Sequence, residues 1–149
     1  MGEYTVASGA VRKRANDLTG KQWTSFSISV WSDIRRNPEE RKLRHPAMFP
    51  VMLVERLVRC FMTEGQKVVL DPFVGSGSTL VACQRLGKSG IGFEISEKFA
   101  RIARRRLVNL MPASNAEQQV ITEDARRLAE FVGRQTVDFC VTSPPYWAF

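Results

Sequence analysis

Residues that build metal centres and disulfide frameworks are scarce in this sequence. It has one histidine and three cysteines among 149 residues, and no two cysteines stand in a Cys-x-x-Cys pair. Zinc sites and disulfide scaffolds need several such residues at close spacing. We therefore expect no metal, and we expect Cys60, Cys83 and Cys140, which lie in apolar segments, to be reduced thiols in the core.

Long apolar runs are lacking too. None reaches the roughly 20 residues of a membrane-spanning helix, and the first residues show neither the basic start nor the apolar stretch of a secretory signal. These absences predict a cytoplasmic protein with no membrane partner. The hydrophobic fraction of 44% and the charged fraction of 25% are typical of a globular domain with a core of its own.

Acidic residues are outnumbered. The 22 lysines and arginines exceed the 15 aspartates and glutamates, which gives a net charge of +7 and a pI near 9.8. The excess is clustered at 12–14, 35–44 and 101–106. A basic balance favours a polyanionic partner such as DNA, although a solvated basic face would explain it equally well.

Four short apolar segments alternate with helix-like patterns after residue 50. We expect strands at 67–71, 90–94, 120–122 and 137–141, and helices at about 53–62, 79–86, 96–110 and 125–132. This alternation predicts an α/β fold with a parallel, doubly wound sheet. Residues 27–31 alternate polar and apolar, as a short strand would, and residues 1–26 are expected to be a loosely ordered arm. The folded part is then 27–149.

A polar residue follows each of the four expected strands: Asp71, Glu94, Asp124 and Ser143. Ligands of such sheets bind at the carboxyl ends of the strands. There, Glu94 can accept hydrogen bonds from both hydroxyls of a ribose, and Asp124 can meet an adenine amino group. Each carboxylate taken alone is explained as well by an ordinary place at a helix N-terminus.

The loop after the first strand contains Gly75 and Gly77, which allow a tight turn and a close approach of the backbone to a ligand. A dinucleotide-binding loop would have a third glycine where Leu80 stands, and the Gly-x-x-x-x-Gly-Lys phosphate loop is absent. The loop therefore suits a ligand that needs close backbone approach without a pyrophosphate cradle.

Two motifs in a fixed order carry a resemblance. Asp-Pro-Phe-Val-Gly-Ser-Gly-Ser-Thr at 71–79 and Thr-Ser-Pro-Pro-Tyr-Trp at 142–147 resemble the cofactor and catalytic loops of the amino-methylating DNA methyltransferases. These enzymes use S-adenosylmethionine to methylate an exocyclic amino nitrogen of cytosine or adenine. Residues 91–95 resemble the family's ribose-binding motif, and 45–50 resemble the segment that folds over the cofactor. The likeness covers roughly 28–147.

The resemblance implies a Rossmann-like class I methyltransferase sheet, here incomplete, with about four parallel strands in the order three, two, one, four. It implies that S-adenosylmethionine is held by His45, Pro46, Phe49, Asp71, Pro72, Phe73, Gly75, Gly77, Ser78, Thr79, Glu94, Ile95, Asp124 and Ser143. Catalysis falls to Ser143, Pro144, Pro145 and Tyr146. Ser143 and the Pro144 carbonyl would accept hydrogen bonds from the target amino group, and Tyr146 would stack on the base.

The target base and the substrate class have alternatives. Ser143, where many relatives have aspartate, favours cytosine-N4 over adenine-N6 methylation, and it weighs against RNA and protein substrates. A cytosine-C5 enzyme would need a Pro-Cys nucleophile, whereas Cys140 lies inside an expected strand. A different class of function is a basic, non-catalytic module that binds nucleic acid or a partner protein.

The family sheet normally has seven strands, and a separate region reads the DNA sequence. With four strands, this chain is expected to need a second protein chain or a further C-terminal segment. The cofactor loop precedes the catalytic loop, so the sequence resembles a rearranged or split enzyme of a restriction-modification system. A piece of a longer protein and a degenerate remnant are the other two explanations.

Overall fold

A computed structural model describes residues 16, 18–43, 48–111 and 115–144. The elements in chain order are α1 (Gly20–Phe26), α2 (Pro38–Lys42), α3 (Val51–Phe61), β1 (Val68–Asp71), α4 (Ser78–Arg85), β2 (Ser89–Phe93), α5 (Glu97–Val108), β3 (Gln118–Ile121), the 3-10 turn η1 (Ala125–Arg127), α6 (Leu128–Phe131) and β4 (Phe139–Cys140).

The four strands form one parallel sheet in the order β3-β2-β1-β4. Asp71 at the end of β1 lies opposite Gly92, and Ile121 at the end of β3 lies opposite Phe93, so the carboxyl ends are level. The predicted α/β class, parallel sheet and strand order are confirmed.

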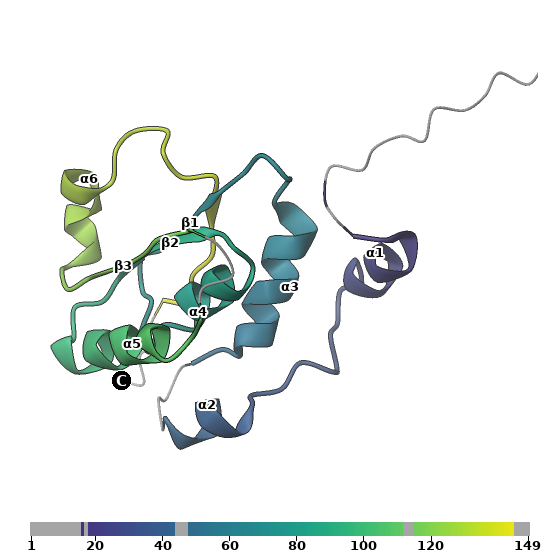
Figure 1. The fold of residues 1–149 in the computed structure, drawn as a ribbon, viewed down its shortest axis with the longest axis horizontal. Helices are drawn as coiled ribbons and strands as arrows, with labels where there is room; N and C mark the ends of the chain where they lie inside the picture. Colours follow the sequence, from purple (N-terminus) through teal and green to yellow (C-terminus); the bar gives the residue numbers. More distant parts are fainter. Residues whose placement is uncertain (1–15, 17, 44–47, 112–114, 145–149) are drawn as a thin grey trace, which may run out of the picture.

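Helices cover the two faces of the sheet unequally (Figure 1). Val69 points into a core formed with α3, α4 and α5, which includes Val54, Val58 and Leu107. Its neighbour Leu70 points to the opposite face, because side chains alternate along a strand. Among the described residues, that face packs against η1, α6 and adjacent residues. The result is three layers, with the heavier helical layer on the α3–α5 side.

The N-terminal segment differs from its prediction. Within the expected loose arm, residues 20–26 form α1, whose capping box joins Thr19 and Gln22. The predicted strand at 27–31 is wrong, because residues 27–29 form bends and residues 30 and 31 belong to no helix or strand. Ile28 and Val30, the apolar members of its alternation, are 53% and 75% exposed, so no buried face holds an extended strand there.

One side chain fastens this segment to α3. Arg56, which is 9% exposed, pairs with both carboxylate oxygens of Asp33 at 2.8 and 2.5 Å. Its guanidinium also lies 4.7 Å from the ring centre of Phe26 and 5.2 Å from that of Trp31. A stacked, bidentate arginine is well suited to such a junction, which we call the Arg56 junction.

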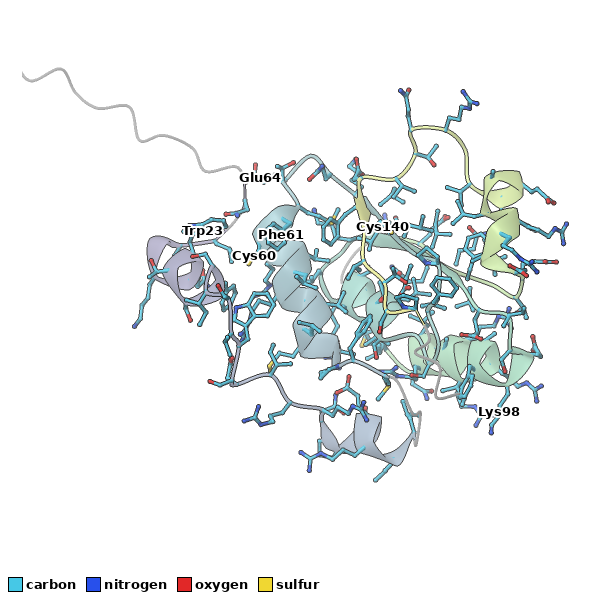
Figure 2. The ribbon with its side chains drawn as sticks, turned by 180° about the vertical axis from the view of Figure 1, so that it is seen from behind. Trp23, Cys60, Phe61, Glu64, Lys98 and Cys140 are labelled. Carbon is cyan, nitrogen blue, oxygen red and sulfur yellow. The ribbon has the colours of Figure 1, made fainter. Side chains whose placement is uncertain are left out.

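The cysteine prediction is correct for two residues of three. Cys60 and Cys83 are buried, whereas Cys140 is exposed. Cys140 lies on β4 (Figure 2), which has β1 as its single neighbour in the described sheet. An edge strand leaves one side uncovered, and this explains the exposure.

Two kinds of feature are absent from the described ranges. No helix there is long and apolar enough to cross a membrane. The same residues contain no group of three or more His, Cys, Asp or Glu side chains placed to share a metal ion.

Candidate functional site

The strand ends are tied together by backbone hydrogen bonds. The Val74 N–H donates to the Phe93 carbonyl at 2.8 Å, Glu94 N–H to the Ile121 carbonyl at 3.0 Å, and Val141 N–H to the Leu70 carbonyl at 3.0 Å. These bonds continue the ladders beyond the strands. They bring the loop at 72–77, which we call the cofactor loop, to the same edge of the sheet as Glu94 and Ser143.

Glycines shape the cofactor loop, partly for a reason that the sequence did not show. Gly75 and Gly77 have φ of 54° and 86°, in the left-handed region that favours glycine. A Cβ on Gly77 would lie 2.8 Å from the Ala103 Cβ. Gly77 therefore also lets α4 begin directly against α5, so a ligand is not needed to explain it.

Asp71 stabilises the cofactor loop and the start of α4 through hydrogen bonds. Its carboxylate accepts hydrogen bonds from the Phe73 N–H at 3.0 Å and from the Thr79 hydroxyl at 2.5 Å, and the residue is 1% exposed. Burial raises the pKa of Asp71, while the hydrogen bonds from Thr79, Phe73 and the Thr142 side chain oppose that rise. Asp71 thus joins the cofactor loop to the first turn of α4.

The predicted cofactor residues divide by exposure. Buried members are Asp71, Gly75, Gly77, Ser78 and Thr79, which form the frame of the loop. Phe73 and Ile95 are 44% and 72% exposed. Two apolar side chains thus reach solvent beside the strand ends. Phe73 directly follows Pro72, and Ile95 directly follows Glu94.

Glu94 is half-buried at the end of β2. Its Oε1 accepts a hydrogen bond from the Ser96 N–H at 2.8 Å. Ser96 is the N-cap residue of α5, yet its own side chain makes no capping bond. Glu94 therefore contributes to the start of α5, while a carboxylate has capacity for several hydrogen bonds.

Asp124 is engaged more fully. Its Oδ2 accepts from the Arg126 Nη2 at 2.6 Å and Nε at 2.9 Å, and its Oδ1 accepts from the Arg126 N–H at 2.9 Å. These hydrogen bonds lower the pKa of Asp124 to about 2. The helix N-terminal role weighed for this carboxylate is therefore present, and its contact with an adenine stays a prediction.

The catalytic motif is described only in part. Ser143 is half-buried and Pro144 exposed, just beyond β4. Pro145 and Tyr146, with His45 and Pro46 of the segment expected to cover the cofactor, lie outside the described residues. Phe49 is partly buried against the core of the α3–α5 side.

A buried pair of charged side chains beside the cofactor loop was not predicted from the sequence. Glu40 is 2% exposed and lies 3.8 Å from Arg106, whose side chain is 16% exposed. Arg106 Nη1 donates to the Ser76 carbonyl at 2.7 Å. The sequence held one signal of this burial. Arg106 follows Phe99 and Ala103 at helical spacing on the apolar face of α5, where a charged residue is unexpected.

Comparison with known proteins agrees with this geometry. A family described as DNA methylase matches residues 5–105. The type II methyltransferase M2.DpnII of Streptococcus pneumoniae is 38% identical over 96 residues, which cover 64% of this chain and 33% of the relative. M.ScaI of Streptomyces caespitosus is 40% identical over 79 residues, which cover 52% of this chain and 25% of that enzyme.

Solved structures show the same fold. A candidate DNA modification methylase from Thermus thermophilus superposes with a TM-score of 0.55 and 32% identity, over 76% of this chain and 46% of that one. Its complex with S-adenosylmethionine gives a TM-score of 0.52. The chain thus spans about a third or less of the two methyltransferases above and under half of the Thermus protein.

Proposed function

The chain belongs to the DNA methylase family, and from that premise we propose that it is the cofactor-binding and catalytic part of an amino-methylating DNA methyltransferase. One observation carries the proposal: Asp71 accepts hydrogen bonds from Phe73 of the cofactor loop and Thr79 of α4, while the Val141 N–H donates to the carbonyl of the preceding residue, Leu70. These bonds support a site in which the first residues of the catalytic motif follow β4 at the edge where ligands of parallel sheets bind.

S-adenosylmethionine fits the residues at this edge. Glu94 would accept hydrogen bonds from the ribose hydroxyls, and the exposed side chains of Phe73 and Ile95 offer apolar surface to the adenine ring. Asp124 would meet the adenine amino group with lone pairs left free beside Arg126. When bound, the cofactor supplies an activated methyl group on a sulfonium.

Ser143 and Pro144 would prepare the target nitrogen. The lone pair of an exocyclic amino group is delocalised into its ring, so the nitrogen is a weak nucleophile. Hydrogen bonds accepted by Ser143 Oγ and by the Pro144 carbonyl would draw the amino group toward tetrahedral geometry and direct its lone pair. Such acceptors act best when they are fixed in advance. The base must first leave the duplex.

The proposed target is the N4 of cytosine, with the N6 of adenine as the alternative, on the strength of Ser143. Methylated DNA digested to nucleosides and analysed by mass spectrometry distinguishes the two products. N6-methyldeoxyadenosine alone would contradict the cytosine assignment.

The proposed partners are DNA and a protein segment that extends the sheet beyond β4. The chain spans about a third of the length of M2.DpnII, so the segment that completes the base pocket would come from a second chain or from further residues of the same one.

The first experiment is a calorimetric titration of S-adenosylmethionine into the chain. Binding near one to one is expected, and Glu94→Ala should weaken it at least tenfold, because buried bonds to charged groups are worth about 1.5–3 kcal/mol. Glu97→Ala is the matched control, since Glu97 is exposed and pairs with Arg101 and Arg104. Salt-sensitive DNA binding with no cofactor binding would favour the non-catalytic module instead.

Ser143→Ala tests the catalytic assignment in the assembled enzyme. Loss of one preorganised polar group at the reacting centre is expected to lower the rate of methyl transfer about 100-fold. Full methyl transfer by this variant would refute the role of Ser143.

A further inference from the structure

Arg106 of α5 is enclosed between the N-terminal segment and the cofactor loop. Its Nη1 donates to the Ser76 carbonyl at 2.7 Å and lies 3.4 Å from Ser78 Oγ. Its Nη2 lies 3.8 Å from Glu40 Oε1. A single guanidinium thus bridges α2, α5 and the loop, using separate nitrogens on its two sides.

Glu40 is tied into the same region by both carboxylate oxygens. Oε1 accepts from the Val51 N–H, the first residue of α3, at 2.7 Å. Oε2 accepts from the Asn37 N–H at 2.7 Å, within the capping box of α2. The carboxylate therefore fixes the starts of two helices as well as facing Arg106.

Stability alone does not account for this arrangement. Burial lowers the pKa of Arg106, and Glu40 opposes that shift. The guanidinium also lies at the first residue of α4, where the helix dipole disfavours a cation. A buried ion pair is often no more stabilising than apolar residues of the same size. What the pair does supply is a fixed donor for a carbonyl in the middle of the cofactor loop.

That loop needs external support. Gly75 and Gly77, on either side of Ser76, have positive φ and give the backbone unusual freedom. Ser76 is held at both its polar groups, because its hydroxyl donates to Met48 Sδ at 2.8 Å while Arg106 holds its carbonyl. A loop that visits other conformations binds its ligand more weakly, in proportion to the fraction of time it is competent.

We propose that Arg106 and Glu40 are positioning residues that hold the cofactor loop in its ligand-binding conformation. This inference rests on the proposed function for the identity of the ligand, S-adenosylmethionine. The two side chains act through the Ser76 carbonyl and are not themselves placed against the ligand.

The test compares Arg106→Lys and Glu40→Gln with Arg105→Lys and Glu39→Gln. Arg105 and Glu39 are exposed neighbours in the sequence, so the controls make the same chemical changes outside the network. Lysine keeps the charge of Arg106 but has one nitrogen in place of three, and glutamine removes the charge of Glu40. Each test variant is expected to raise the dissociation constant of S-adenosylmethionine about tenfold, against less than twofold for each control.

The double variant shows whether the two residues act together. If they form one device, Arg106→Lys combined with Glu40→Gln should bind no more weakly than the worse single variant, because the second change removes nothing further. Multiplied losses, near a hundredfold, would mean that the residues act independently and would overturn the proposal.

Hydrogen exchange separates positioning from general stability. In the test variants the amides of residues 73–78 should exchange faster, while those of β3 should keep their wild-type rates. A rise across both segments, including outright unfolding, would show a merely structural role, and unchanged rates would show no role. If the unaltered chain fails to bind S-adenosylmethionine, the proposed function fails, while the exchange pattern still decides whether Arg106 and Glu40 hold the loop.

Discussion

Gly77 affects both the conformation of the cofactor loop and the packing of α4 against α5. Its backbone is left-handed, and its missing side chain leaves room for Ala103. Gly92 repeats the second feature, because a Cβ there would lie 2.8 Å from the Val74 Cβ. Both glycines let the cofactor loop pack closely against the residues next to it.

We predict that Gly77→Ala lowers the free energy of unfolding by about 2–4 kcal/mol, the sum of a left-handed alanine and an overpacked contact. Urea denaturation followed by circular dichroism measures it. Gly65→Ala is the control, since nothing lies within 4 Å of its added Cβ, and it should leave stability unchanged or slightly raised. Equal stability of the two variants would show that α4 and α5 move apart at little cost.

At this scale the sequence predicted the positions of the loop residues better than their partners. The Asp-Pro-Phe lead-in and the two glycines located the cofactor loop. The contact between Gly77 and Ala103 joins distant parts of the chain, and nothing in the local pattern indicates it. Arg106 was similarly grouped with the basic cluster at 101–106, and its pairing with Glu40 was not predicted, because burial of a charge depends on a partner that only the fold supplies.

Among the elements, the N-terminal segment shows the largest difference from its prediction. Alternation at 27–31 suggested a strand, yet the segment is held by the stacked guanidinium of the Arg56 junction and by the Trp31 indole, which donates to the Phe26 carbonyl at 2.9 Å. The four expected strands of the sheet, in contrast, were all found, with different bounds for β3 and β4, because short apolar runs between helix-like patterns are typical of strands.

The Arg56 junction should make the free energy of unfolding depend on pH in the acidic range. The hydrogen bond from Arg56 lowers the pKa of Asp33 from 3.8 to about 2. A carboxylate with a lower pKa in the folded state stabilises the fold above its unfolded pKa, and that contribution is lost as the pH falls toward the folded pKa. It is thus present above about pH 4 and disappears between about pH 4 and 2.

Asp33→Asn should therefore lower stability at about pH 6 and flatten its dependence on pH below about 4. Thermal unfolding recorded from about pH 6 to about pH 2 measures both effects. Glu117→Gln, an exchange of another exposed acid, should follow the wild type. An Asp33→Asn profile parallel to the wild type would show that the pair contributes nothing that depends on protonation.

For the whole molecule, the open sheet is the dominant feature. β4 contributes two paired residues beside β1, and in the described part of the chain no strand pairs with its other side. Unprotected edges promote pairing between copies of a chain, while the net charge of +7 opposes it by repulsion.

We predict concentration-dependent association through β4, measured by light scattering in reducing buffer. Cys140→Lys places a charge on that edge and should shift the chain toward monomer. Val108→Lys, at an 83% exposed position on α5, is the control and should associate like the wild type. A monodisperse monomer at all concentrations would contradict the prediction.

The exposure of Cys140 also makes the edge accessible to selective chemical labelling. The other two thiols are 7% and 0% exposed, so a maleimide should modify Cys140 first. Partial desolvation by its neighbours raises the pKa of the exposed Cys140 thiol, and only the thiolate reacts, so labelling should quicken in mildly alkaline buffer. A fluorophore attached there would stand three residues before Ser143. Slower labelling of the free Cys140 thiol would report directly that another segment has docked along β4.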